Sequence, residues 1–79
     1  MLLIAFDSTQ QALRTEMLLD YAEIESDTQP TPKSITAGCA LSIGFPEEDF
    51  TRVKEILVAE EVEIRGVFRQ EADGYVQVL

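Results

Sequence analysis

The only thiol in the chain, Cys39, is the side chain best suited to covalent chemistry. It directly follows Gly38, where a proline-bearing loop meets an alternating strand pattern. A thiol at such a junction can be exposed, and the neighbouring glycine lets backbone N–H groups approach the sulfur. A reactive thiolate also needs a nearby cation or hydrogen-bond donors, and Lys33 is the nearest cation in sequence. Other cations that folding could bring close are Arg14, Arg65 and Arg69.

A second interpretation of Cys39 stays open, in which it is a small core residue. Cys39 is in phase with Leu41, Ile43 and Phe45, the apolar positions of the strand pattern. Free cysteine is among the most buried residue types. The excess of carboxylates in the chain also opposes a thiolate. Exposure and reactivity of the thiol distinguish the two interpretations.

The other residue types exclude several kinds of site. Histidine is absent and cysteine occurs once, which excludes a histidine triad, a closed zinc site and an internal disulfide. The consecutive acids Glu47, Glu48 and Asp49 cannot all face one ion from a helix. They are interpreted as a solvated first helical turn that complements the helix dipole. We therefore expect no metal and no cofactor.

The net charge of the chain and the lengths of its apolar runs restrict its possible binding partners and its cellular compartment. Fifteen acidic against six basic residues give a net charge of −9, which disfavours nucleic acid and anionic membranes. The apolar run 2–6 lacks the basic flank of a signal peptide, and no apolar run approaches the ~20 residues of a membrane helix. A cytoplasmic protein of one domain, residues 1–79, is predicted.

Hydrophobic periodicity predicts the elements that must position Cys39. In chain order they are a strand at 2–6, a helix at 9–22, a weak strand at 23–27, a loop at 29–38, a strand at 39–45, a helix opening at 46–49, a strand at 61–70, a turn at 72–74 and a strand at 75–79. This β-α-β-β-α-β order predicts an α+β, ferredoxin-like domain. Its antiparallel sheet would carry both helices on one face and end in a short C-terminal hairpin strand.

The helices are expected to bury one apolar stripe each. In the first helix the stripe is Leu13, Met17 and Tyr21, and Ser8 with Gln11 fits a capping box. The remaining expected core residues are Phe50, Val53, Ile56 and Leu57 of the second helix and Ile4, Ile43 and Phe68 of the sheet. Tyr75 is expected to pack on the hairpin.

The sheet face away from the helices predicts self-association. It would present Ala40, Ser42 and Gly44 together with Leu3 and Ala5. These residues are too small or too apolar for a well-solvated surface, so a second copy or a partner is expected to cover them.

The segment Thr31-Pro32-Lys33-Ser34-Ile35-Thr36-Ala37-Gly38-Cys39 carries a more specific pattern. It resembles the TPR-x-I-x-x-x-CG stretch of a small family of selenium/sulfur-carrier-like proteins. Further marks of the family are Phe6-Asp7-Ser8-Thr9 before an Ala/Leu-rich helix, Phe45, Pro46-Glu47 and Val53-Lys54-Glu55-Ile56-Leu57. The resemblance covers essentially the whole chain. It departs at Lys33, where arginine is common, and at Ala40, where glycine is common.

The resemblance implies a carrier rather than a turnover enzyme. Cys39 would accept a sulfur or selenium atom as a persulfide or perselenide and pass it between a donor and an acceptor protein. The residues that would bind around it are Thr31, Pro32, Lys33, Gly38 and Ala40. The alternative is a ferredoxin-like regulatory or protein-interaction module in which the cysteine is structural.

Overall fold

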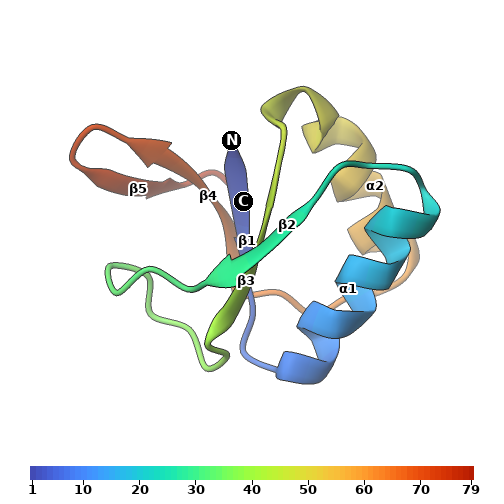
Figure 1. Cartoon of the computed structure of the whole chain (residues 1–79), viewed down its shortest axis with the longest axis horizontal. Helices are drawn as coiled ribbons and strands as arrows, with labels where there is room; N and C mark the ends of the chain where they lie inside the picture. The colour runs from blue at the N-terminus through green and yellow to red at the C-terminus, as the bar shows by residue number, and fades with distance from the viewer.

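The computed structural model describes all residues, 1–79. Its elements are β1 (Leu2–Ala5), α1 (Thr9–Tyr21), β2 (Asp27–Pro30), β3 (Leu41–Phe45), the 3₁₀ turn η1 (Glu47–Asp49), α2 (Phe50–Ala59), β4 (Gly66–Glu71) and β5 (Gly74–Gln77). The protein is thus a small α+β domain with two helices and a five-stranded sheet (Figure 1). Neither helix has the length and apolar character needed to cross a membrane.

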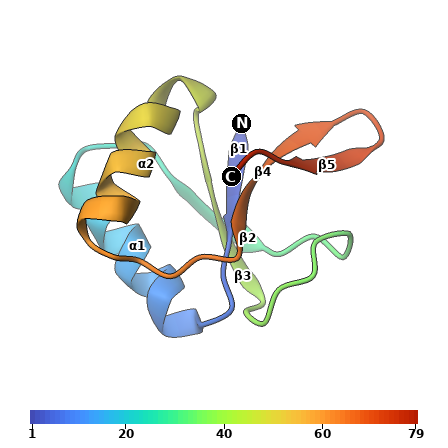
Figure 2. The same ribbon diagram turned by 180° about the vertical axis from the view of Figure 1, so that it is seen from behind.

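The sheet has the strand order β2-β3-β1-β4-β5, and every neighbouring pair is antiparallel. β1 is central and wholly buried, and its Ile4 lies opposite Ile43 of β3 and Val67 of β4. Figures 1 and 2 show both helices on one side of β1 and β3. The loop 31–40 and the β4–β5 hairpin extend away from the helices. The loop 31–40 therefore lies on the side of the sheet away from the helices and returns to the sheet at the start of β3.

The main core lies between the sheet and the helices, and part of its composition differs from expectation. Ile4, Ile43, Val53 and Leu57 are buried as predicted. The predicted stripe of α1 is wrong, because Leu13, Met17 and Tyr21 are 50%, 71% and 90% exposed. Instead α1 buries Ala12, Thr15 and Leu19. The small side chains of Ala12 and Thr15 suit close packing on the sheet, and Thr15 satisfies its hydroxyl by donating to the Gln11 carbonyl.

The helix ends also differ from the predicted pattern. Ser8 is the N-cap of α1, but its side chain makes no capping hydrogen bond, so the predicted capping box with Gln11 is not formed. Pro46 precedes a 3₁₀ turn, and the α-helical part of the second helix begins only at Phe50. The three acids are exposed or half-buried in that turn, as expected of a solvated start. Glu47 pairs with Arg69 of β4 at 2.7 Å.

The second strand was predicted four residues too early. β2 spans Asp27–Pro30 and pairs with β3, with Pro30 opposite Leu41. Because β2 is at the sheet edge, the missing N–H of Pro30 is tolerated there. β3 begins at Leu41 rather than at Cys39, so Cys39 belongs to the incoming loop.

The sheet face away from the helices is covered by the chain itself. Leu3 and Ala5 are buried together with Ile35 of the loop, and Phe68 and Tyr75 pack against them. Phe68 therefore lies on the opposite face from the one predicted, while Val67 occupies the helix side. Ser42 and Gly44 are also buried, and Ala40, beyond the end of β3, is exposed. The open apolar patch that favoured a homodimer is therefore absent.

Candidate functional site

Cys39 lies where the end of β1, the start of α1 and the loop 31–40 meet. Its backbone N–H donates to the carbonyl of Phe6, the residue after β1, at 3.0 Å. Its side chain belongs to the main core cluster, and the residue is 3% exposed. The prediction of an accessible sulfur is therefore wrong, and the thiol is buried.

Two polar groups nevertheless contact the sulfur. The backbone N–H of Leu41 donates to Cys39 Sγ at 3.3 Å, and the Thr9 hydroxyl lies 3.3 Å from Sγ. Thr9 is the first residue of α1, so the sulfur lies at the helix end that favours negative charge. When the sulfur is a thiolate, both groups donate to it. A backbone N–H therefore lies within reach of the sulfur, but it belongs to Leu41, while the N–H of Gly38 donates to Asp7.

Hydrogen bonds of Thr31 hold the loop 31–40 against the sheet. The Thr31 N–H donates to the Ala40 carbonyl at 2.8 Å, and its hydroxyl donates to the Cys39 carbonyl at 3.0 Å. The same hydroxyl lies 2.6 Å from the hydroxyl of Ser42, which is fully buried. Thr31 therefore fixes the backbone on the C-terminal side of the thiol rather than the sulfur itself.

The carboxylate of Asp7 holds the loop 31–40 at a second point. The Gly38 N–H donates to Asp7 Oδ1 at 2.8 Å, and Arg65 pairs with the same oxygen at 3.1 Å. The Gly38 hydrogen bond, followed by the charge of Arg65, holds the pKa of Asp7 below its usual value. Gly38 is also needed sterically, because a Cβ there would lie 2.8 Å from the Asp7 carbonyl oxygen. This tie is exposed, and it closes the loop next to Cys39.

The remaining predicted binding residues are placed around the loop. Lys33, Gly38 and Ala40 are exposed, and Pro32 is half-buried. Lys33 makes no ion pair, whereas Arg14, Arg65 and Arg69 pair with Glu60, Asp7 and Glu47. None of these four cations contacts the sulfur. No cluster of acidic or cysteine side chains suited to a metal ion is present.

Sequence reasoning missed the roles of Asp7 and Thr9. Both are more than 29 residues from Cys39 along the chain, and only the fold brings them to it. The one available signal was that Phe6-Asp7-Ser8-Thr9 is among the family marks. Asp7 directly follows Phe6 at the end of β1, and its carboxylate holds the loop through the Gly38 N–H. The strand end, helix start and loop therefore form one site.

This architecture defines a small α+β domain with a single thiol held at a helix start. The family model described as "Putative Se/S carrier protein-like" matches residues 1–69 of the chain. The chain belongs to this family, and the match includes the whole thiol site. No curated protein and no solved structure matches the chain significantly.

Proposed function

We propose that the protein is a thiol-based carrier that accepts a sulfur or selenium atom on Cys39 and delivers it to an acceptor protein. The observation that carries this proposal is the position of the only thiol in a chain of this family. Its sulfur lies at the start of α1, within 3.3 Å of the Thr9 hydroxyl and of the Leu41 N–H. A core cysteine needs neither contact, whereas a thiolate or a terminal persulfide sulfur needs donors.

The loading step is an exchange without net oxidation. The Cys39 thiolate attacks the outer sulfur of a donor persulfide, R–S–SH, and an S–S bond to Cys39 forms as the donor S–S bond breaks. The donor leaves as the thiolate R–S⁻ and Cys39 becomes Cys–S–SH. A donor of the form R–S–SeH gives Cys–S–SeH in the same way. Delivery is the reverse exchange onto an acceptor thiolate.

Loading requires the loop 31–40 to open, because Cys39 is 3% exposed. The contacts that close it are few. They are the Thr31 hydrogen bonds, the burial of Ile35 and the Gly38–Asp7 tie. Exposed loops with few buried contacts open locally at a lower free energy than the whole fold. Donor proteins would gain access to the sulfur in this open state.

The loop residues supply the surroundings of the loaded atom. Lys33 is exposed and unpaired, so its ammonium is available to an anionic persulfide in the open state. Gly38 and Ala40 flank Cys39 in sequence, and the Gly38 N–H becomes available to the loaded atom only when its hydrogen bond to Asp7 breaks. The ring of Pro32 restricts the loop. Thr31 positions the Cys39 backbone through its 3.0 Å bond to the Cys39 carbonyl.

Intact-mass spectrometry tests the proposal. The folded protein is incubated with glutathione persulfide, then with excess acceptor thiol. Wild type is expected to gain one sulfur atom and to lose it to the acceptor, and the Cys39→Ser variant is expected to gain none. A Thr9→Val variant keeps its side-chain volume but loses the hydroxyl, and it should load more slowly. Loading that occurs only after unfolding would reject the proposal.

The burial of Cys39 favours a second candidate, a protein-interaction module with a structural cysteine. In that case Cys39 contributes to the core with Ile4 and Ile43. Cys39→Ala would then lower stability without changing any exchange reaction. Equal partner binding by wild type and Cys39→Ala, with no sulfur gain by wild type, would support this candidate.

We further propose that the fold is ferredoxin-like, with β5 added at one edge. The order β2-β3-β1-β4 and the antiparallel pairing of its neighbours support this assignment. An experimental structure with the helices on opposite faces of the sheet would reject it.

A further inference from the structure

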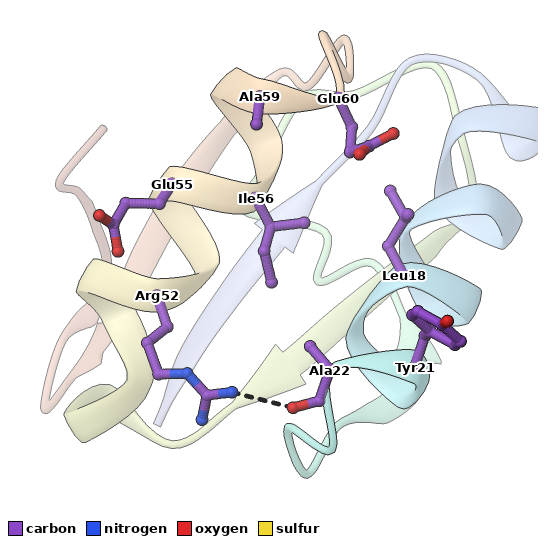
Figure 3. Close-up of a pocket in the computed structure, with 8 residues that line it drawn as sticks. All are labelled: Leu18, Tyr21, Ala22, Arg52, Glu55, Ile56, Ala59 and Glu60. Atoms are coloured by element: carbon purple, nitrogen blue, oxygen red, sulfur yellow. Dashed lines mark hydrogen bonds between the residues drawn. The ribbon is translucent and has the colours of Figure 1, made fainter.

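A groove runs between the two helices, on the molecular surface away from the sheet. It has a volume of about 520 Å³ and is mostly apolar. Figure 3 shows Leu18 and Tyr21 of α1 and the following residue Ala22 on one side and residues of α2 on the other, with Ile56 projecting between the helices. None of its lining residues belongs to the loop 31–40, so the groove is separate from the thiol site.

The groove is kept open by two arginines that each reach across to the end of the other helix. Arg52 of α2 donates to the Ala22 carbonyl at 2.9 Å, drawn as a dashed line in Figure 3. Arg14 of α1 donates to the Glu60 carbonyl at 2.8 Å and pairs with the Glu60 carboxylate at 3.3 Å. These bonds satisfy carbonyl groups at both helix C-termini. They also fix the spacing of the helices, so the groove is a preformed feature.

Apolar surface continues from the groove onto the outer face of α1. Leu13, Met17 and Tyr21 recur every four residues and are 50%, 71% and 90% exposed. Three large apolar side chains along one exposed helical stripe are more than a solvated surface requires. Tyr21 belongs to both features, so the stripe and the groove form one continuous apolar surface.

The charges around this surface are mainly negative and unpaired. Both arginines at the groove are already engaged with carbonyl groups and carboxylates. By contrast Asp20 and Glu55 are exposed and form no ion pair, whereas the Glu16 carboxylate accepts a hydrogen bond from the Thr28 hydroxyl of β2. The chain as a whole carries a net charge of −9. A second copy would bring two strongly acidic surfaces together, which is electrostatically unfavourable.

We infer that the α1–α2 surface is a docking site for a basic amphipathic helix of a partner protein. Apolar side chains of that helix, spaced three and four residues apart, would fill the groove and cover Tyr21 and Met17. Its lysines or arginines would face Asp20 and Glu55. Because this surface does not include Cys39, docking is independent of whether the thiol carries an atom.

Binding of a synthetic peptide to the full-length protein tests the inference. The probe is a helical peptide of about sixteen residues with leucines at helical spacing and lysines on the flanks. Its binding to the ¹⁵N-labelled protein is followed by chemical-shift changes. We expect these to concentrate on Leu18, Tyr21 and Ile56 and to be the same in Cys39→Ser. Two comparison peptides replace either the lysines with glutamate or the leucines with serine, and both should bind more weakly.

Matched variants separate docking from general attraction to an acidic protein. Tyr21→Gln removes an exposed aromatic anchor and should weaken binding about tenfold. Val76→Gln is the control, because Val76 is 51% exposed on the hairpin that extends away from the helices (Figure 1). It should bind as wild type does. Equal binding of the serine peptide, or equal affinity of Tyr21→Gln and wild type, would overturn the inference. A wild-type dimer that buries Tyr21 would also overturn it by assigning the surface to a second copy.

Discussion

Substituting Gly38 with alanine should loosen the loop over Cys39 without unfolding the domain. A Cβ on Gly38 would lie 2.8 Å from the Asp7 carbonyl oxygen and 3.3 Å from its Cα. Both are backbone atoms, so the loop must shift to relieve the contact. Overpacking of this kind costs about 1–3 kcal/mol. If the cost falls on the closed loop, the open population rises about 5- to 150-fold.

The assay is the rate at which a thiol reagent labels Cys39 in the native protein. In the fast-closing regime this rate is proportional to the population of the open loop, so it should rise by the same factor in Gly38→Ala. Gly44→Ala is a matched control, because its Cβ would meet Gln29 Nε2 at 2.6 Å and Met1 Sδ at 2.9 Å. Those atoms end flexible side chains that can move away, so labelling should stay at the wild-type rate.

Two results would refute this reasoning. One is a labelling rate in Gly38→Ala equal to that of wild type. The other is an opening free energy, calculated from the labelling rate, that equals the free energy of global unfolding measured in urea, in wild type as well as in Gly38→Ala. The second result would mean that the thiol is reached through whole-chain unfolding and that no separate loop opening exists.

Three further predictions concern stability, measured by urea unfolding. The lowered pKa of Asp7 means that its contribution is present above the ordinary carboxyl pKa and is lost as pH falls through the folded-state pKa. Wild type should therefore lose more stability than Asp7→Asn between about pH 5 and pH 3, and equal losses would contradict the role of Asp7. Val53→Ala, at a fully buried position, should cost about 2–3 kcal/mol, whereas Val58→Ala, at a position 73% exposed, should change stability by less than about 0.5 kcal/mol. A cost below that of Val58→Ala would place Val53 outside the core. Glu61→Gly should gain about 1 kcal/mol, because Glu61, the residue after the C-cap of α2, has a φ of 51°. No gain would show that this conformation is unstrained.

Periodicity predicted β1 and β3 because both carry apolar residues, whereas β2, Asp27–Pro30, has no apolar run and was predicted too early. Periodicity did not predict which stripe of α1 is buried, because two stripes have helical spacing: Leu13, Met17 and Tyr21, and Ala12, Thr15 and Leu19. Leu13 and Met17 are more apolar than Ala12 and Thr15, yet the smaller pair faces the sheet. Side-chain size at the helix–sheet contact decided between them, and size depends on the opposing strands rather than on spacing.

The site was predictable only in its central residue. A lone cysteine after a glycine is visible in any sequence, but its burial depends on how the loop returns to β1. The Thr9 and Asp7 contacts arise because the end of β1 and the start of α1 meet the loop there. Likewise Pro30 suggested a loop, and only its place on an edge strand explains why it pairs with Leu41.

The most direct test of the carrier function is transfer of an isotope-labelled sulfur atom through Cys39 in the folded protein. The protein is loaded from a persulfide labelled at its outer sulfur, isolated, and mixed with an acceptor thiol in the absence of denaturant. The carrier function predicts that the label is bound to Cys39 after loading and moves to the acceptor faster than the protein unfolds. It also predicts faster loading in Gly38→Ala and none in Cys39→Ser. A folded protein that takes up no label, while its unfolded form does, would contradict the carrier function and leave Cys39 as a core residue.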